Sequence, residues 1–243
     1  FYYIYNSSEF QDILQYSFAF NGYLDVTNSI KKQIKEKSLN KVKILKNKKS
    51  TLKFKNFHHP LIEEEKAIKN NISLKKNKII TGPNASGKTT LLKSCAINIL
   101  LCQQVGFGYV ESGKITPFHY IHCYMNIPDT NGRDSLFQAE ARRCLDILNH
   151  MDENKYKRHF AVFDELYSGT NPYEAISSAY SYLRYISKNT NVKFILTTHY
   201  IKLCELMKQD KKKTENCNME TIINNDNPTY KYKIKKGISK IKG

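Results

Sequence analysis

One glycine-rich segment carries the residue types that bind phosphate groups. It reads Thr81-Gly82-Pro83-Asn84-Ala85-Ser86-Gly87-Lys88-Thr89-Thr90, and residues 82–89 match the full pattern G-x-x-x-x-G-K-[ST]. Glycines let the backbone turn its N–H groups onto phosphate oxygens. Lys88 would then neutralise the β- and γ-phosphates, and the Thr89 hydroxyl would hold Mg²⁺. Residues 82–90 therefore predict a site for a nucleoside triphosphate with Mg²⁺.

The flanking residues predict the two elements that such a loop requires. Ile79-Ile80 runs directly into the loop and is typical of a buried strand. After the loop, apolar residues recur at the spacing of one helix face, at Leu91, Leu92, Cys95, Ala96, Ile99 and Leu100. The amino terminus of that helix would add partial positive charge. Strand, loop and helix in this order argue against a chance match.

A pair of acids follows a second apolar segment. Phe160-Ala161-Val162-Phe163 leads into Asp164-Glu165, which is the Walker B pattern. Asp164 would reach the Mg²⁺ shell, and Glu165 would orient and deprotonate the attacking water. An apolar run before two acids is a weak signal by itself, but this one comes about 75 residues after the phosphate-binding loop. We therefore interpret Asp164 and Thr89 as Mg²⁺ ligands and Glu165 as the general base.

A histidine follows the next predicted strand. Residues 193–198 are typical of a strand, and His199 comes directly after them. In parallel α/β sheets, ligands bind at the carboxyl ends of the strands. A lone histidine is usually structural, but at this place we expect His199 to sense the γ-phosphate. Lys88, Glu165 and His199 are the candidate catalytic residues.

Three further segments predict helices. Residues 10–18 have an amphipathic pattern. Asn171-Pro172-Tyr173-Glu174 is a helix start, with a capping Asn and Pro at the first position, and this helix is expected to end near residue 187. A third helix is predicted from one apolar face made by Phe137, Ala141, Cys144, Leu145 and Leu148.

Strands and loops complete the pattern. Residues 72–74 and 79–80 predict two strands that meet at a lysine-rich turn, and residues 115–125 predict another strand. Tyr230, Tyr232 and Ile234 alternate with lysines, as in a strand with one wet face. Residues 208–218 are expected to form a charged loop.

One histidine-rich stretch has a spacing that suggests zinc. It is His119-x-x-His122-Cys123, inside the strand predicted over residues 115–125. Strand alternation would send His119 and His122 to opposite faces. We therefore predict no metal ion at this motif, with zinc as the weak alternative.

The chain is strongly basic. Its formal net charge is +17, which favours a polyanionic partner such as nucleic acid. A lysine-rich genome is an equally good explanation, because Lys and Asn are both abundant. Residues 31–55 are the most basic stretch, with Glu36 as their single acid. This stretch would contact a phosphate backbone or, as charge runs more often do, form a solvated connector.

The cysteine pattern and the absence of a targeting segment indicate the cellular compartment. Six cysteines occur without a C-x-x-C pair, which favours reduced thiols inside the cell over a disulfide framework. We find no signal peptide or membrane span, so we expect an intracellular protein; cytoplasm, nucleus and viral factory are not distinguished. The sequence begins with Phe1, so we expect a fragment.

Taken in order, these motifs resemble the ABC-type ATPases and, among them, the MutS family. The resemblance covers about residues 18–243, and several motifs carry it. They are Thr81-Gly82-Pro83-Asn84, Asp164-Glu165-Leu166 with Gly169-Thr170, Thr198-His199-Tyr200, Ser135-Leu136-Phe137-Gln138-Ala139-Glu140, Gly237-Ile238-Ser239 and Leu24-Asp25-Val26. Tyr167-Ser168-Gly169-Thr170-Asn171 and Glu140-Ala141-Arg142-Arg143 resemble the divergent MutS-like branch.

The resemblance implies an α/β P-loop ATPase with a mostly parallel sheet flanked by helices. Residues 1–57 would be the end of the helical lever and a basic connector, and residues 58–243 the ATPase domain. Two such domains would dimerise head to tail, as a homodimer or a heterodimer, and Ser135 would contact the partner's nucleotide. ATP binding would close the dimer and change its grip on DNA, mismatched or branched. Mismatch reading itself rests on the resemblance alone.

The family pattern is not fully matched. Ala67 stands before Ile68-Lys69-Asn70, where the family carries an aromatic residue that stacks on adenine. The alternatives are another ABC-type DNA-repair or chromosome ATPase of the SMC kind, a nucleotide-binding scaffold that no longer hydrolyses ATP, and a P-loop kinase. The spacing of about 75 residues leaves no room for the coiled coil of the first. Glu165, as an intact general base, argues against a scaffold without hydrolysis. No motif marks the phosphoryl-acceptor site that a kinase would need.

Overall fold

The computed structural model describes residues 6–46, 50–125, 135–210, 212–224 and 227–239, and its chain forms two compact units, residues 1–40 and 41–243. The described residues of the first unit include the helix α2 (Ser8–Lys35), which begins where the Ser7 hydroxyl accepts a hydrogen bond from Phe10 N at 3.1 Å. The helix predicted over residues 10–18 is confirmed. No described residue of α2 is buried, and its exposed apolar side chains include Tyr16 and Phe18.

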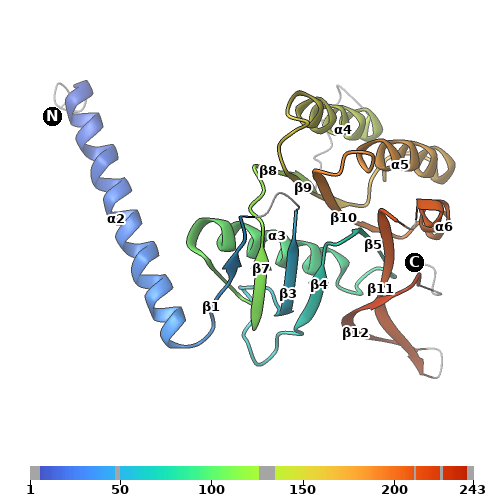
Figure 1. Cartoon of the computed structure of the whole chain (residues 1–243), viewed down its shortest axis with the longest axis horizontal. Coiled ribbons are helices and arrows are strands. Elements are labelled where there is room, and N and C mark those ends of the chain that lie inside the picture. The colour runs from blue at the N-terminus through green and yellow to red at the C-terminus, as the bar shows by residue number, and fades with distance from the viewer. Residues whose placement is uncertain (1–5, 47–49, 126–134, 211, 225–226, 240–243) are drawn as a thin grey trace. The chain divides into compact units, whose positions relative to one another are not determined.

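The second unit is organised around a six-stranded sheet (Figure 1). Its strands, in spatial order, are β12 (Asn227–Lys236), β11 (Thr214–Asn224), β5 (Asn77–Thr81), β10 (Val192–Thr198), β9 (His159–Asp164) and β8 (Tyr120–Tyr124). Every neighbouring pair is parallel except β11 with β12. The predicted α/β fold with a mostly parallel sheet is therefore confirmed.

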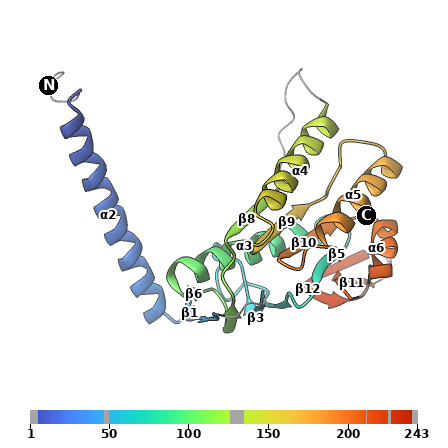
Figure 2. The same cartoon turned by 45° about the horizontal axis from the view of Figure 1, so that its top comes forward.

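Helices cover both faces of this sheet (Figures 1 and 2). They are α3 (Lys88–Val105), α4 (Leu136–Glu153), α5 (Pro172–Ile186) and α6 (Ile201–Met207), followed by the short 3₁₀ helix η1 (Lys208–Asp210). In β9, Phe160 and Val162 pack into the same core cluster as α3, whereas Ala161 and Phe163 pack into the cluster of α4, α5 and α6. Strand alternation thus divides the core into two layers.

A second sheet has four strands, three of which come before α3 in the chain and one after it. Its order is β2 (Lys43–Ile44), β7 (Ser112–Ile115), β3 (Leu52–Phe57) and β4 (Asn70–Ser73), and two-residue strands β1 (Asn40–Lys41) and β6 (Phe107–Gly108) also occur. In β3, Leu52 and Phe54 are buried while Lys53 and Lys55 are exposed. Strands β2 and β3 were not predicted, because residues 31–55 have the composition of one basic run.

The two strands predicted over residues 72–74 and 79–80 are present as β4 and β5, with Lys75 and Lys76 between them, although they belong to different sheets. Three other predictions of local structure are corrected. The strand predicted over residues 115–125 is split: β7 ends at Ile115 and the chain then crosses through Pro117 to β8. The loop predicted over residues 208–218 contains the first part of β11, which pairs with β5 despite its polar composition. Leu145, placed on the apolar face of α4, is 53% exposed.

The other predicted elements are present. The helix start at Asn171 is confirmed, since its side chain accepts hydrogen bonds from Tyr173 N and Glu174 N at 3.1 Å each. The strand around Tyr232 is β12. Among the described residues, no helix has both the length and the apolar composition needed to cross a membrane.

Candidate nucleotide-hydrolysis site

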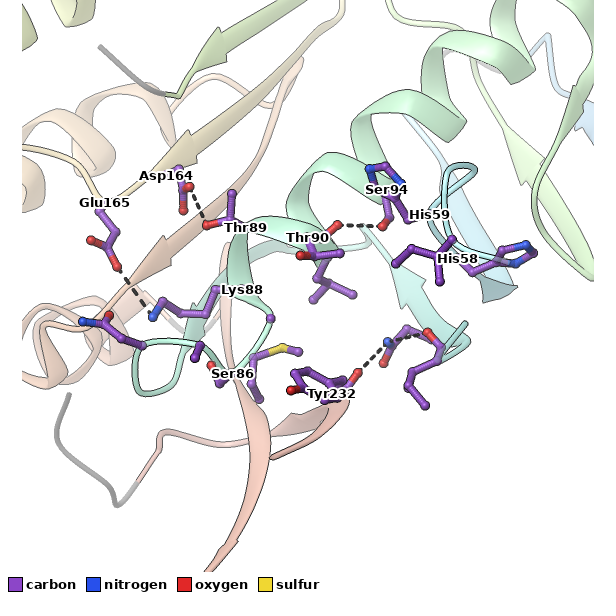
Figure 3. A pocket seen from close by; sticks show the side chains of 18 of the residues that line it. His58, His59, Ser86, Lys88, Thr89, Thr90, Ser94, Asp164, Glu165 and Tyr232 are labelled. Carbon is purple, nitrogen blue, oxygen red and sulfur yellow. Dashed lines mark hydrogen bonds and ion pairs between the residues drawn. The ribbon is translucent and has the colours of Figure 1, made fainter. Parts of the chain in front are cut away.

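A cavity opens where three parallel strands of the central sheet end. β5, β10 and β9 finish at Thr81, Thr198 and Asp164, and their register places these ends at one edge. The cavity has a volume of about 820 Å³ and is lined by residues of the phosphate-binding loop together with Asp164 and Glu165 (Figure 3). This is the edge at which open α/β sheets bind ligands.

The phosphate-binding loop ends in a helix start that has no side-chain cap. Gly87 is the N-cap residue of α3, with φ 89° and ψ 17°, and it supplies no capping side chain. The first N–H groups of α3 are therefore available to an anion from the cavity, and the helix dipole favours one. This is the helix start that the sequence predicted.

The glycines of the loop leave space that a side chain would fill. A Cβ on Gly87 would lie 2.9 Å from Tyr232 Cδ1, in a left-handed conformation that disfavours any side chain. A Cβ on Gly82 would lie 2.7 Å from the Ser86 hydroxyl oxygen. That hydroxyl is buried and has no hydrogen-bond partner among the described residues. The loop thus keeps a polar atom and close backbone approach for a ligand.

Lys88 lies along the inside of the loop. Its side chain is 5% exposed, and its ammonium donates hydrogen bonds to Gly82 O at 2.9 Å and Pro83 O at 3.1 Å. The Glu165 carboxylate lies 3.6 Å away. A buried ammonium needs such partners, and carbonyl oxygens are partners that a phosphate can replace.

The two residues predicted to hold Mg²⁺ meet across the site. Thr89 Oγ1 donates a hydrogen bond to Asp164 Oδ2 at 2.7 Å (Figure 3). The other carboxylate oxygen of Asp164 accepts from the Thr197 hydroxyl. A carboxylate and a hydroxyl at the phosphate-binding loop are the oxygen ligands that Mg²⁺ prefers. The residues therefore fit the ion, and their roles as ligands remain a prediction.

Glu165 lies between two basic side chains. Its Oε1 is 3.6 Å from Lys88 Nζ and 3.6 Å from His199 Nδ1. These neighbours, His199 first and then Lys88, lower the pKa of the Glu165 carboxyl, although partial burial opposes them. Glu165 also has φ 52°, an unusual conformation for a residue other than glycine, and its N–H donates to Thr197 O at 3.0 Å. The carboxylate is thus ionised at neutral pH and held in a strained turn.

Ser135 is apart from this group. It is the N-cap of α4: its hydroxyl accepts from Gln138 N at 3.3 Å, and its own N–H donates to Gln138 Oε1 at 3.0 Å. Ser135 thus begins the helix that was predicted from the apolar face of Phe137 to Leu148. Ser135 is exposed and does not line the cavity, whereas Lys88, Thr89, Asp164 and Glu165 all do. His199 is also absent from the lining and reaches the site through Glu165.

Glu140 is a site residue that sequence analysis did not assign. It lies on α4, is 2% exposed and lines the cavity. Its carboxylate accepts hydrogen bonds from Ser168 N and the Ser168 hydroxyl, both at 2.9 Å, and from Gly169 N at 3.0 Å. Glu140 therefore fixes the loop that follows Glu165. The sequence signal that could have indicated this role was an acidic residue among the apolar positions of α4.

The far side of the cavity is formed by residues 57–70 and by β12, and its side chains are partly apolar and partly polar. Ile62, Ala67 and Ile68 line it, together with Tyr232 of β12. Asn70 holds β12 there, since its amide donates to Tyr232 O at 2.9 Å and accepts from Ile234 N at 2.8 Å. Ala67, at the position where the resemblance predicts an aromatic residue, thus lines the cavity, and Tyr232 is an aromatic side chain that lines the same region.

Comparisons with known proteins agree with this geometry. The family model "MutS domain V" matches residues 78–242. The chain is 30% identical over 194 residues to the DNA mismatch repair protein MutS of Persephonella marina, covering 77% of this chain and 22% of that protein. It is 33% identical over 190 residues to the endonuclease MutS2 of Lactobacillus gasseri, covering 75% and 23%. The chain thus spans less than a quarter of either relative's length.

The charge arrangement around Glu165 predicts a pH-dependent stability. Its pKa is lowered in the folded protein, so the ionised carboxylate stabilises the fold above its ordinary pKa of about 4.3, and this contribution is lost as the pH falls through the folded value. Glu165→Gln should therefore lower the free energy of unfolding at pH 7, and the difference from the wild type should shrink below pH 4. Urea unfolding without nucleotide measures it.

The matched control is Glu153→Gln, which removes one carboxylate at the exposed end of α4. A stability difference for Glu165→Gln that is the same at pH 7 and near pH 3 would contradict the charge interaction with Lys88 and His199.

Proposed function

This chain belongs to the MutS family. From that premise we propose that its cavity binds and hydrolyses ATP, and that this hydrolysis controls how the protein binds DNA. MutS domain V is the ATPase domain of that family, so the match supports ATP use at a general level. One observation carries the assignment to residues: Lys88, the Thr89–Asp164 pair and Glu165 converge at the uncapped start of α3.

Each side chain has a role that its surroundings support. Lys88 exchanges its bonds to Gly82 O and Pro83 O for phosphate oxygens, while residues 82–90 hold the phosphates through backbone N–H groups. Thr89 and Asp164 would hold Mg²⁺, which neutralises phosphate charge when bound. Glu165, already ionised, takes the proton of the attacking water. His199 orients Glu165 from 3.6 Å and contacts the γ-phosphate.

The ABC-type arrangement would complete the site with a second subunit. Ser135 presents an exposed hydroxyl and the N–H groups of the first turn of α4, which suit a γ-phosphate on a partner. Further along α4, Glu140 grips Ser168 and Gly169 just after the general base. Dimer closure on Ser135 would therefore reach the catalytic turn through α4, and this is the proposed coupling of ATP to movement.

DNA is the proposed partner that this movement serves. The net charge of +17 suits a polyanion, and the relatives include proteins named for DNA mismatch repair and for endonuclease activity. The chain matches less than a quarter of both, so the match favours neither of these activities. The division into a lever and connector over residues 1–57 and an ATPase domain over residues 58–243 belongs to the same proposal, as does an intracellular location.

The first test of the function concerns nucleotide binding. Lys88→Ala should weaken ATP binding by roughly 30-fold or more, because truncating a buried, hydrogen-bonded charge costs about 2 kcal/mol or more. Lys93→Ala is the matched control, since Lys93 is on the same helix and does not line the cavity. Calorimetric titration with Mg²⁺ and ATP measures both. Equal affinities for wild type and Lys88→Ala would remove Lys88 from the site.

The second test asks whether the site is shared between subunits. Lys88→Ala and Ser135→Arg should each be nearly inactive alone. In a mixed dimer, the Ser135→Arg subunit keeps its own Lys88 and receives a sound Ser135 from its partner. Mixing the two variants should therefore restore part of the ATPase activity, as measured by phosphate release at high protein concentration.

The full-length protein should be used for this mixing test, and heterodimers should be shown to form. If heterodimers form and the ATPase activity stays at the sum of the activities of the two variants, two explanations are left. Either Ser135 acts in its own subunit, or one site cannot hydrolyse ATP unless the other site does so too. A covalently linked dimer with a single Ser135→Arg change then distinguishes these two explanations.

A further inference from the structure

Three histidines gather inside the protein at the end of the sheet away from the phosphate-binding loop. They are His122 on β8, His150 on α4 and His159 on β9. His159 is the first residue of β9 and Asp164 the last, so the two ends are roughly 16 Å apart at about 3.3 Å per residue. The cluster is therefore separate from the proposed ATPase site, and its role does not depend on ATP hydrolysis.

The fold brings these histidines together from positions that no local sequence motif links. In the parallel register of β8 and β9, Tyr120 is opposite His159 and His122 is opposite Ala161, so both histidines lie on the face that α4 covers. His150 is in the last turn of α4. One ligand nitrogen from each of the three rings lies within 4.8 Å of the other two.

The hydrogen bonds fix how the rings present their nitrogens. His159 Nε2 is 3.0 Å from the backbone oxygen of Asn154, which can only accept, so Nε2 carries the proton and Nδ1 offers a lone pair. His122 Nε2 lies 3.0 Å from that Nδ1. His150 Nδ1 is buried and has no hydrogen-bond partner among the described residues. A buried nitrogen without a partner is unusual, because buried polar atoms are normally hydrogen-bonded.

The surroundings of His122 and His159 favour their uncharged forms. Burial, and then the neighbouring histidines, lower the pKa of His122 to about 4, and burial likewise lowers the pKa of His159. Neutral imidazole is the form that binds metal ions. His122 and His159 are buried, whereas His150 is partly exposed.

We propose that His122, His150 and His159 form a binding site for one Zn²⁺ ion, with water at the fourth position. Three imidazoles and an open position are a common zinc set. With Zn–N bonds of about 2.0–2.1 Å, tetrahedral ligands are about 3.3 Å apart, close to the 3.0 Å between His122 Nε2 and His159 Nδ1. The Asn154 carbonyl supplies the outer hydrogen bond that orients a ligating histidine.

Binding requires two small changes and no net loss of protons. The proton on His122 Nε2 moves to its Nδ1, which frees the Nε2 lone pair. The three ligand nitrogens, already within 4.8 Å of one another, move closer together around the ion. The His119-x-x-His122-Cys123 motif contributes one ligand only. His119 is outside the cluster, where its Nδ1 accepts from Arg158 N at 3.1 Å, and Cys123 is exposed.

The test is Zn²⁺ binding to the metal-free chain without nucleotide. After equilibrium dialysis, elemental analysis should find one Zn²⁺ per wild-type chain. His150→Asn, on the partly exposed helix position, should bind Zn²⁺ at least about tenfold more weakly. His119→Asn, Cys123→Ser and His199→Asn should keep the wild-type affinity, because they probe the surface motif and the ATPase site. Binding of Mg²⁺ and ATP to His150→Asn serves as the check on its folding.

A second measurement needs no variant. Zn²⁺ should shift the ring signals of three of the seven histidines in NMR spectra. Zn²⁺ should also raise the melting temperature of the protein, and a chelator should reverse this increase. The proposal is overturned if the wild type binds no Zn²⁺, if folded His150→Asn binds it as well as wild type does, or if the shifted signals belong to His119 or His199.

Discussion

The parallel register of three strands is the constraint on which the rest of this site depends. Pairing of β10 with β5 sets Thr198 beside Thr81, and pairing of β10 with β9 sets Thr197 beside Asp164. The phosphate-binding loop and the acidic pair, far apart in the chain, therefore end at one edge. A slip of one residue in either ladder would turn these side chains to the opposite face of the sheet.

Placed at that edge, the charged groups neutralise one another without a ligand. Lys88 is buried against two backbone oxygens, Glu165 lies between Lys88 and His199, and Asp164 accepts from Thr89. Each of these partners is one that a phosphate or a metal ion can replace at little cost in hydrogen bonds. The arrangement is preorganised for a charged ligand, and the left-handed turn at Glu165 is the strain that accompanies it.

Local patterns predicted the motifs and their elements well, because a phosphate-binding loop, a buried strand and a capped helix have short-range signals. Prediction failed where pairing partners decide the structure. The polar start of β11 is a strand because β5 offers it a parallel ladder, and Lys53 is in a strand because Leu52 and Phe54 are buried. The three-histidine cluster and the grip of Glu140 on its loop are long-range contacts that composition and spacing do not encode.

The central claim is that Glu165 activates water for ATP hydrolysis in this cavity. Steady-state phosphate release by wild type and by Glu165→Gln, with ATP binding measured in parallel, tests it most directly. The amide keeps the shape but cannot take a proton, so binding should persist while the rate falls by roughly 10²–10⁴-fold. Wild-type turnover in a Glu165→Gln protein that binds ATP normally would contradict the claim and place the general base elsewhere.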